Sequence, residues 1–484
     1  MYNSHYMTNF YLTTTLPYIN AKPHLGFAWE ILTADFIARY HQLLGDQVIF
    51  NTGTDEHGQK VYQKALAAQL DPQAYTDQLV TAFTDLQTLL NLSCTNFVRT
   101  TGKNHQAAAQ SFWQRCADHG DIYKKHYRVK YCVGCEMEKT ESELADGRCP
   151  LHPNLELELR EEENYFFRFS RYQEPLLQLY RDQPDFILGQ GKQKEIISFV
   201  QSGLQDFSIS RLKEKMPWGV PVPGDDTQVM YVWFDALVNY ISTLGWPAPD
   251  SQFAQFWPGV QICGKDNLRQ QAAMWQSMLM SANLPPSKKI LINGFITVGG
   301  AKMSKSLGNV ISPVDLVEKF GQEATRFLIA GFPVYRDDVD ITPVRLADFY
   351  TAHLTNGLGN LSSRLAKLAS LCGQDLPAAT PISGFSPDFA QEIDNFQTNN
   401  ALQNILDRLS ALDQRLSIEK PWLINETKEK AAKLAPLIVQ MRQIAYDLQI
   451  FTPKIAQTLL THFSQAEITP LTPLFPRLQA EKLN

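Results

Sequence analysis

The apolar run 289–296 and the loop that follows it constrain the fold of this chain more than any other feature. The run predicts a buried strand. The Gly299–Gly300 pair after it can adopt backbone conformations closed to other residues, so we expect a mobile loop. Lys302 and Lys305 lie on this loop with Ser304. Two ammonium groups on a flexible loop can approach a leaving pyrophosphate as its charge develops, and the alternative is a solvated Lys/Ser turn.

A second segment, near the N-terminus, has the pattern of a phosphate-binding loop. Residues 10–15 predict a strand, and residues 28–44 predict a long helix. Unpaired amides and the helix dipole face outward where a strand leads through a tight loop into a helix. His24 and Gly26 lie at this junction, and an imidazole there can hydrogen-bond phosphate oxygens. The alternative for His24 is a capped surface residue.

The next predicted strand, 48–53, delivers an acidic segment to the edge of the sheet. Residues 54–58 (Thr-Asp-Glu-His-Gly) follow its carboxyl end, where ligands bind in open α/β folds. Asp55 can accept a hydrogen bond from the α-ammonium group of an amino acid. The alternative is that Asp55 caps a helix beginning near Gln59.

Four candidate metal ligands follow further along the chain. Cys132 and Cys135 form a C-x-x-C pair, and Cys149 and His152 form a C-x-x-H pair after thirteen intervening residues. This spacing predicts a tetrahedral zinc site. Because all four ligands are protein side chains and none is left open, we expect a structural role.

The rest of the chain predicts an interrupted sheet and a helical end. The segment after the metal ligands, up to Pro217, reads as mixed and mainly helical. Residues 230–236 predict an aromatic strand and residues 261–267 another strand, while amphipathic helices dominate beyond Pro343. We therefore divide the chain into 1–115 and 218–300, two halves of one sheet; 116–217, an insertion; 301–345, the lysine loop and a linking segment; and 346–484, a helical domain.

Composition narrows the class of protein. A length of 484 residues corresponds to about three domains. The formal net charge of −6 argues against a protein that coats nucleic acid by bulk charge, and leaves room for a local basic face. No apolar run has the length of a membrane span and no signal-peptide pattern is present, so we expect a cytoplasmic protein with no membrane partner.

The motifs of the two loops resemble those of a known family. Residues 23–26 (Pro-His-Leu-Gly) and 302–306 (Lys-Met-Ser-Lys-Ser) resemble the paired signatures of class I aminoacyl-tRNA synthetases. Residues 54–58 and the Cys/His knuckle, followed by residues 163–167, are typical of methionyl-tRNA synthetases. The resemblance spans essentially the whole chain. It implies an α/β fold, with a Rossmann-like doubly wound parallel sheet that is split by a zinc-knuckle insertion and followed by an all-α anticodon-binding domain.

The resemblance also implies roles for individual side chains. Without it, the aromatic residues would be ordinary core, the arginines surface ion pairs or solvated groups, and the tryptophan of the helical end a half-buried residue. It implies catalytic roles for His24, Lys302, Lys305 and Arg211; ATP binding by His24, Gly26, Lys302, Ser304 and Lys305; methionine binding by Leu16, Tyr18, Asp55, Trp233, Ala236, Tyr240 and Gln271; and anticodon binding by Asn360, Arg364 and Trp422.

The activity that the resemblance implies is ATP-dependent ligation of methionine to tRNA(Met). ATP with Mg²⁺ and methionine would give methionyl-adenylate and pyrophosphate, and transfer to tRNA would release AMP. The chain ends without the domain that dimerises some relatives, so a monomer is expected.

Three positions depart from the pattern of the family. Phe27 replaces a second histidine, Gln271 replaces a histidine, and Asn267 replaces an aliphatic residue. Gln271 supports an alternative, a class I synthetase for another apolar amino acid. Phe27 supports a second alternative, a non-catalytic tRNA-binding relative.

Overall fold

The structure of the chain is a computed structural model that describes residues 7–139, 144–303, 310–332 and 338–478. The described residues form a six-stranded sheet in the order β3-β2-β1-β12-β13-β7, with every neighbouring pair parallel. The strand order reverses between β1 and β12, which creates a topological switch point at their carboxyl ends. The predicted doubly wound sheet is therefore confirmed. Its strands are β1 Asn9–Thr14, β2 Gln47–Thr54, β3 Asn96–Arg99, β7 Ile187–Leu188, β12 Val260–Gly264 and β13 Lys289–Asn293.

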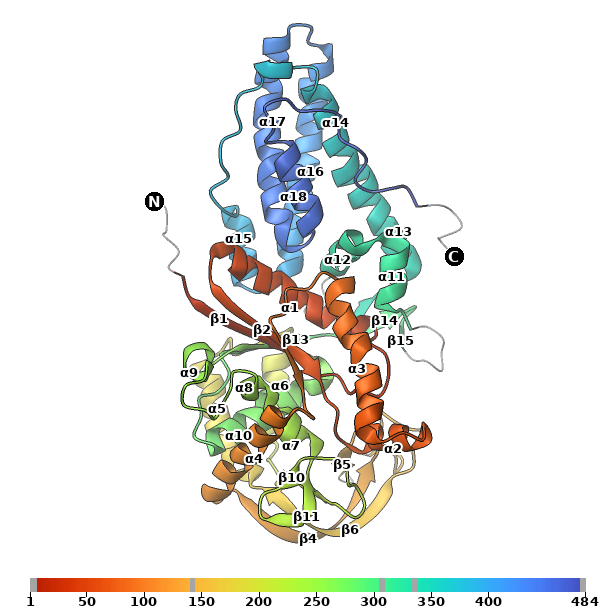
Figure 1. The fold of residues 1–484 in the computed structure, drawn as a ribbon, viewed down its shortest axis with the longest axis vertical. Helices are drawn as coiled ribbons and strands as arrows, with labels where there is room; N and C mark the ends of the chain where they lie inside the picture. The colour runs from red at the N-terminus through yellow and green to blue at the C-terminus, as the bar shows by residue number, and fades with distance from the viewer. Residues whose placement is uncertain (1–6, 140–143, 304–309, 333–337, 479–484) are drawn as a thin grey trace.

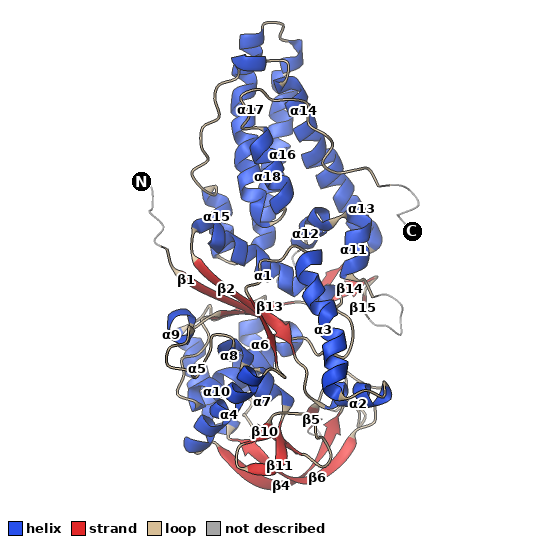
Figure 2. Ribbon diagram, viewed as in Figure 1, coloured by secondary structure: helices blue, strands red, loops and turns tan. Residues whose placement is uncertain are grey.

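Helices cover both faces of this sheet (Figures 1 and 2). Side chains alternate along β1, so that Phe10 and Leu12 enter the core beside α1 while Tyr11 enters the core on the other face. Both cores are apolar because parallel strands are buried on both sides. The helices of this part of the chain are α1 Leu25–Leu44, α2 Gln59–Ala67, α3 Pro72–Leu89, α4 Lys103–Asp118, α8 Asn239–Ser242, α9 Phe253–Phe256 and α10 Trp275–Ser281.

The insertion combines a long strand hairpin with helices, and its segment after the metal ligands is mixed, as expected. Strands β4 and β6 pair over ten residues as a long antiparallel hairpin, and Figure 2 shows them curving along one end of the molecule. Helix α5 then leads to β7, which adds the edge strand of the main sheet, and α6 follows β7. The division at 116–217 remains a prediction. The elements are β4 Ile122–Cys132, β5 Met137–Lys139, β6 Glu158–Phe167, α5 Gln173–Asp182, α6 Lys192–Gln201 and β8 Phe207–Ser208.

The aromatic strand predicted for residues 230–236 is wrong. A small antiparallel sheet, β9 Ser210–Leu212, β10 Pro221–Val222 and β11 Asp225–Met230, ends at Met230, and a short helix, α7 Val232–Ala236, follows. Phe234 of this helix packs against Phe112 and Trp113 of α4. An apolar run of this length cannot distinguish a buried strand from a buried helical turn.

The C-terminal part is helical, as expected, and extends away from the sheet (Figure 1). The lysine-loop region before it contains β14 Ile296–Val298, β15 Ala301–Lys302, α11 Pro313–Phe320, α12 Gln322–Ala330 and β16 Val339–Asp340. The helical domain contains α13 Pro343–Phe349, a π-helix Tyr350–Gly359, α14 Asn360–Ala369, α15 Pro387–Asp394, α16 Thr398–Glu419, α17 Thr427–Asp447 and α18 Pro453–His462.

A buried ion pair joins α12 to α1, and its arginine also bonds the helical domain. Arg326 Nη2 lies 2.7 Å from Asp35 Oδ2, and both side chains are fully buried. The same guanidinium donates to the carbonyl oxygens of Leu90 and Phe451 at 2.9 and 2.8 Å. Burial opposes ionisation of Asp35, but Arg326 and Arg39 hold its pKa below the ordinary value. Three distant parts of the chain therefore meet at one cation.

Substituting Arg326 with Met should destabilise the fold by about 3–5 kcal/mol, because Asp35 would lose a buried partner and several carbonyl groups would lose a donor. Chemical denaturation measures this change. Arg181→Met, at an exposed arginine that bonds Gln178 on the same helix, is the matched control and should change stability by less than about 0.5 kcal/mol. Equal losses in both variants would contradict the role of the pair.

Candidate active site

The segments that follow β1 and β2 are joined by backbone hydrogen bonds. Asp55 N donates to Pro17 O at 3.0 Å, and Ile19 N donates to Asp55 O at 3.0 Å. These bonds form a parallel bridge between Tyr18 and Asp55. Two predicted methionine-binding residues are thus held side by side at the carboxyl edge of the sheet, and Leu16 lies two residues before Tyr18.

Three buried polar atoms near this bridge have no hydrogen-bond partner among the described residues. They are Tyr18 Oη, Asp55 Oδ1 and Trp233 Nε1. The rings of Tyr18 and Trp233 meet edge to face, with centroids 6.0 Å apart. Because an unpaired buried polar group costs about 1–3 kcal/mol, such a group in a native fold calls for a ligand or water. An acceptor, a donor and a hydroxyl are the groups that the ammonium and carboxylate of an amino acid would bind.

The carboxyl group of Asp55 lies in an acidic environment. Burial, Asp235 and Glu136 together raise its pKa well above the ordinary value. A positive charge placed beside Asp55 would reverse this shift. The alternative role of Asp55 as a helix cap is wrong, because the N-cap residue of α2 is Gly58.

Asp235 was not expected to lie in a histidine cluster. Its Oδ2 lies 3.0 Å from His57 Nδ1, and its Oδ1 lies 3.2 Å from His105 Nε2. Burial opposes the charge of Asp235, but the two histidines hold its pKa below the ordinary value. Both carboxylate oxygens are therefore engaged by the protein, and Asp235 positions the segment that carries Trp233 and Ala236.

The other predicted pocket residues form a polar chain inside the core. Gln271 Nε2 donates to Tyr240 Oη at 2.6 Å, and Gln261 Nε2 donates to Gln271 Oε1 at 3.3 Å. The ring of Tyr240 packs against Trp275 with centroids 5.8 Å apart. Gln271, a departure from the family pattern, is buried and fixes the tyrosine hydroxyl.

The two signature loops meet at their flanks. Leu25 N, at the start of α1, donates to Ile311 O at 3.2 Å. His24 precedes Leu25, and its Nδ1 accepts from Gly26 N at 3.0 Å. In the neutral ring the proton is then on Nε2, which becomes the donor nitrogen. The segment that closes the lysine loop therefore lies directly beside the histidine.

The near end of the lysine loop is a tight turn. Strands β14 and β15 pair across Gly299 and Gly300, whose φ angles are 63° and 77°. Asp340 Oδ1 accepts from Gly300 N at 2.8 Å and ties the turn to β16. The glycines thus serve the turn that was expected of them. The side chain of Lys302, and residues Ser304 and Lys305 entirely, lie outside the described residues.

Glu30 is a buried acid that the sequence analysis did not identify. It lies on α1, and its Oε1 accepts from Thr15 N at 2.7 Å and from Thr15 Oγ1 at 2.6 Å. Burial raises the pKa of Glu30 to about 7, and Asp266 on the neighbouring loop adds to this. The switch point therefore contains a carboxyl group that titrates near neutrality. An acidic residue among the apolar residues of the first two turns of α1 was the available signal.

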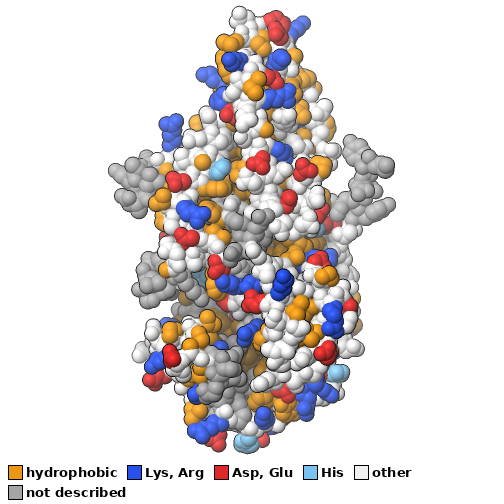
Figure 3. Space-filling view, turned by 180° about the vertical axis from the view of Figure 1, so that it is seen from behind, with side chains coloured by type: hydrophobic (Ala, Val, Ile, Leu, Met, Phe, Trp, Pro, Cys, Tyr) orange, Lys and Arg blue, Asp and Glu red, His pale blue; other side chains and the backbone are white. Residues whose placement is uncertain are grey.

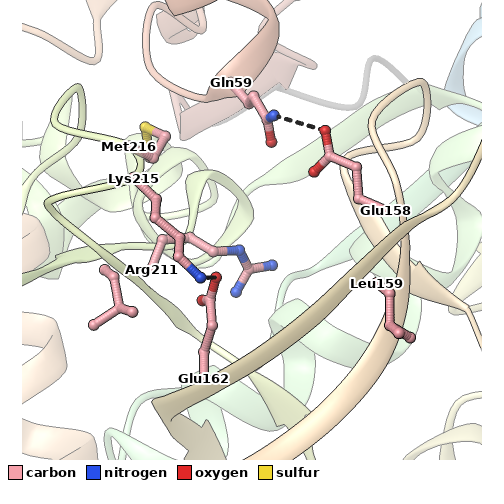
Figure 4. Close-up of a pocket in the computed structure, with 8 residues that line it drawn as sticks. Gln59, Glu158, Leu159, Glu162, Arg211, Lys215 and Met216 are labelled. Atoms are coloured by element: carbon pink, nitrogen blue, oxygen red, sulfur yellow. Dashed lines mark hydrogen bonds and ion pairs between the residues drawn. The ribbon is translucent and has the colours of Figure 1, made fainter.

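Arg211 belongs to the junction between the insertion and the sheet. It is 5% exposed and donates to Ser208 Oγ at 2.8 Å, so the alternative of a surface ion pair is wrong. Its guanidinium lies over the rings of Tyr131 and Tyr231. Figure 4 shows it in a cavity beside Lys215, which pairs with Glu162 at 3.0 Å. Its contacts include Ser208 and the two tyrosine rings, and a catalytic role remains a prediction.

The four predicted metal ligands converge. Their ligand atoms all lie within 4.8 Å of one another, with Cys135 Sγ 3.2 Å from His152 Nδ1 and 3.5 Å from Cys149 Sγ. Ligands of tetrahedral zinc lie about 3.5–3.8 Å apart, given metal–ligand bonds of about 2.0–2.3 Å. A Cβ atom at Gly134 would lie 2.4 Å from the ring of His152, so this close approach requires glycine. The cluster can hold a metal ion.

The predicted anticodon-binding residues lie on the helical domain. Asn360 and Arg364 are on α14, where Arg364 Nη1 pairs with Asp413 Oδ1 at 2.6 Å. Trp422 is 45% exposed in a 3₁₀ turn, Pro421–Leu423, that contacts α17. Figure 3 shows basic and acidic side chains interspersed on the visible face of this domain.

Phe27, the departure at the second histidine position, is a packing residue. It is buried, and its ring meets Phe83 of α3 edge to face with centroids 5.9 Å apart. A histidine here would turn toward the same core.

Among the described helices, none is long and apolar enough to cross a membrane.

Comparison with known proteins agrees with this geometry. The profile of the family described as "tRNA synthetases class I (M)" matches residues 10–156 and 138–366. A methionine–tRNA ligase of Thermosynechococcus vestitus is 39% identical over 93% of this chain and 89% of its own length. One of Rickettsia typhi is 36% identical over 95% of this chain and 93% of its own length.

Solved structures give the same result. Mycobacterium tuberculosis methionyl-tRNA synthetase in complex with methionyl-adenylate superposes with a TM-score of 0.90 and 33% identity, covering 97% of this chain and 100% of that one. The apo form of that enzyme gives a TM-score of 0.82, with 31% identity over 98% of this chain and 99% of its own. A switch-point sheet with two apposed signature loops is the architecture of a class I aminoacyl-tRNA synthetase. The chain belongs to the methionine family of that class.

The raised pKa of Glu30 predicts a pH-dependent stability. The folded state holds the proton of Glu30 more tightly than the unfolded state. Protonated Glu30 therefore adds to the free energy of unfolding in full below about pH 4.5, and this stabilisation is lost as the pH rises through about 7. Relative to Glu30→Gln, wild-type protein should lose about 2–3 kcal/mol of unfolding free energy between pH 5 and 8. Denaturant titrations at both pH values measure this. Glu195→Gln, at an exposed acid, is the control, and parallel profiles for wild type and Glu30→Gln would contradict the shift.

Proposed function

We propose that this protein ligates methionine to tRNA(Met) in two steps at the carboxyl edge of the parallel sheet. In the first step the methionine carboxylate attacks the α-phosphorus of ATP, and the bond to pyrophosphate breaks. In the second step the terminal adenosine of tRNA takes the acyl group and AMP leaves. No side-chain nucleophile is needed, so positioning and charge stabilisation supply the rate.

The apposition of the two signature loops carries this proposal. The bond between Leu25 N and Ile311 O holds the end of the lysine loop beside the N-terminus of α1. A triphosphate at that terminus would meet the helix dipole, the Nε2–H of His24 and the lysine loop together. We assign Lys302 and Lys305 to pyrophosphate, with Gly26 and Ser304 completing the ATP site. Mg²⁺ would enter with ATP, held by its phosphate oxygens.

The unpaired groups near the Tyr18–Asp55 bridge support the amino-acid site. Asp55 Oδ1 would accept a hydrogen bond from the ammonium group of the amino acid. Tyr18 Oη and Trp233 Nε1, which also have no partner among the described residues, would hydrogen-bond other polar atoms of the ligand. Aromatic rings pack well against a thioether, which favours methionine among apolar amino acids. Leu16, Ala236, Tyr240 and Gln271 would complete the wall of this site.

Two further assignments follow the same reasoning. The three thiolates and one imidazole of the cluster are soft and borderline ligands, which favour Zn²⁺, and a bound ion would hold the knuckle rigid. In the helical domain, Asn360, Arg364 and Trp422 would read and stack unpaired bases of the tRNA anticodon.

Amino-acid-dependent pyrophosphate exchange tests the proposed function. Methionine should support exchange at least about 100-fold better than leucine, isoleucine or valine. Exchange driven best by another amino acid, or by none, would overturn the proposal.

Substituting His24 with Ala should lower kcat for exchange about 100-fold, because a donor to the phosphates is lost. The dissociation constant for methionine should not change. His462→Ala, at a histidine of α18 that bonds Thr469 in the helical domain, is the control. A parallel loss of methionine affinity in His24→Ala would contradict the assignment.

Substituting Trp422 with Ala should raise the KM for tRNA about 10-fold or more, because base stacking on an aromatic ring is lost. Methionine-dependent exchange, which needs no tRNA, should stay at the wild-type rate. Leu423→Ala, at an exposed neighbour, is the matched control. The assignment fails if both variants raise the KM equally.

A further inference from the structure

A residue of the metal knuckle contacts the segment that carries Asp55. Glu136 follows the ligand Cys135, is 1% exposed, and has a left-handed φ of 52°. Its Oε1 accepts from Lys60 N at 2.7 Å, and its backbone oxygen accepts from Tyr231 Oη at 2.8 Å. The knuckle therefore contacts the first turn of α2, which follows the segment of Asp55, and Tyr231, two residues before Trp233.

The contact with Lys60 replaces a missing helix cap. Lys60 N lies in the first turn of α2, where amides have no partner within the helix. The N-cap residue Gly58 has no side chain, so Glu136 supplies the acceptor from the insertion. Figure 4 shows a second link at this turn, where Gln59 Nε2 donates to Glu158 Oε1 at 3.5 Å.

The backbone at Gly58 is shaped for this contact. A Cβ atom there would lie 2.6 Å from Glu136 Oε2, and its φ of 94° disfavours any other residue. Gly58 closes the segment 54–58 that contains Asp55. Burial is the main cause that raises the pKa values of Tyr18 and Asp55, and the carboxylate of Glu136 adds to it in both.

We propose that Glu136 is a positioning residue that caps α2 from the metal knuckle and so holds Asp55 in place for the ammonium group of the amino acid. This inference rests on the proposed function. It assigns the knuckle a second task beyond its own fold, since the same hairpin that gathers Cys132 and Cys135 presents Glu136. Loss of the cap should loosen residues 54–58 and weaken amino-acid binding more than nucleotide binding.

Glu136→Gly is the main variant, because glycine accepts the left-handed backbone and keeps the carbonyl that bonds Tyr231. The KM for methionine in pyrophosphate exchange should rise about 10-fold, with kcat and the KM for ATP within about 2-fold of wild type. Glu136→Gln, whose amide oxygen can still accept from Lys60 N, should restore the KM to within about 3-fold. The zinc content of each purified variant, measured by mass spectrometry, should match wild type.

The matched control is Asp71→Ala, which removes the acceptor for Gln73 N and Ala74 N at the N-cap of α3. It should leave the KM for methionine unchanged. An unchanged KM in Glu136→Gly, an equal rise in Asp71→Ala, no rescue by glutamine, or loss of zinc from Glu136→Gly would each overturn the proposal.

Hydrogen exchange separates this inference from the proposed function. The amide hydrogens at the start of α2 should exchange about 10-fold faster in Glu136→Gly than in wild type, whichever amino acid the enzyme activates. The absence of methionine-dependent pyrophosphate exchange in wild type, together with lost protection of these amides in Glu136→Gly, would mean that the proposed function fails and the capping contact stands. If the amides are as protected as in wild type, the capping role fails.

Discussion

Two backbone hydrogen bonds between the segments after β1 and β2 organise the candidate site. The bonds from Asp55 N to Pro17 O and from Ile19 N to Asp55 O extend the pairing of the two strands beyond the sheet. They fix Tyr18 and Asp55 side by side before any ligand arrives. Such preorganisation matters for a reaction without a side-chain nucleophile, because orientation then supplies most of the rate. The ring of Trp233 packs against Tyr18. Burial and the carboxyl groups of Asp235 and Glu136 raise the pKa of Asp55.

The same sheet places the nucleotide side of the site. Helix α1 begins at the switch point and runs between the sheet and the helical domain, where Asp35 meets Arg326 in a buried ion pair. Its N-terminus bonds Ile311, so the end of the lysine loop is tied to the helix that would receive the phosphates. The helix thus connects the phosphate end of the site to the domain proposed to bind tRNA. Figure 1 shows this placement between the two parts.

Features that depend on neighbouring residues could be predicted from the sequence. The loop and helix start at His24, the glycine turn before Lys302 and the knuckle of Cys132 and Cys135 are local patterns with a physical cause in a few residues. Features that depend on distant partners could not. The hairpin of β4 and β6, the helix at Val232 and the trans cap from Glu136 each need a partner far along the chain. Glu30 was missed because burial in the folded chain, which the residue type does not reveal, raises its pKa.

Proton release on methionine binding tests the central claim most directly. In the free protein, burial and the acidic neighbours Asp235 and Glu136 raise the pKa of Asp55, and a bound ammonium group would lower it again. Isothermal titration of methionine at several pH values between about 5 and 8, in buffers of different ionisation enthalpy, counts the protons. The account predicts net proton release in wild type that is lost in Asp55→Asn together with most of the affinity. The same proton count and affinity in both proteins would contradict it.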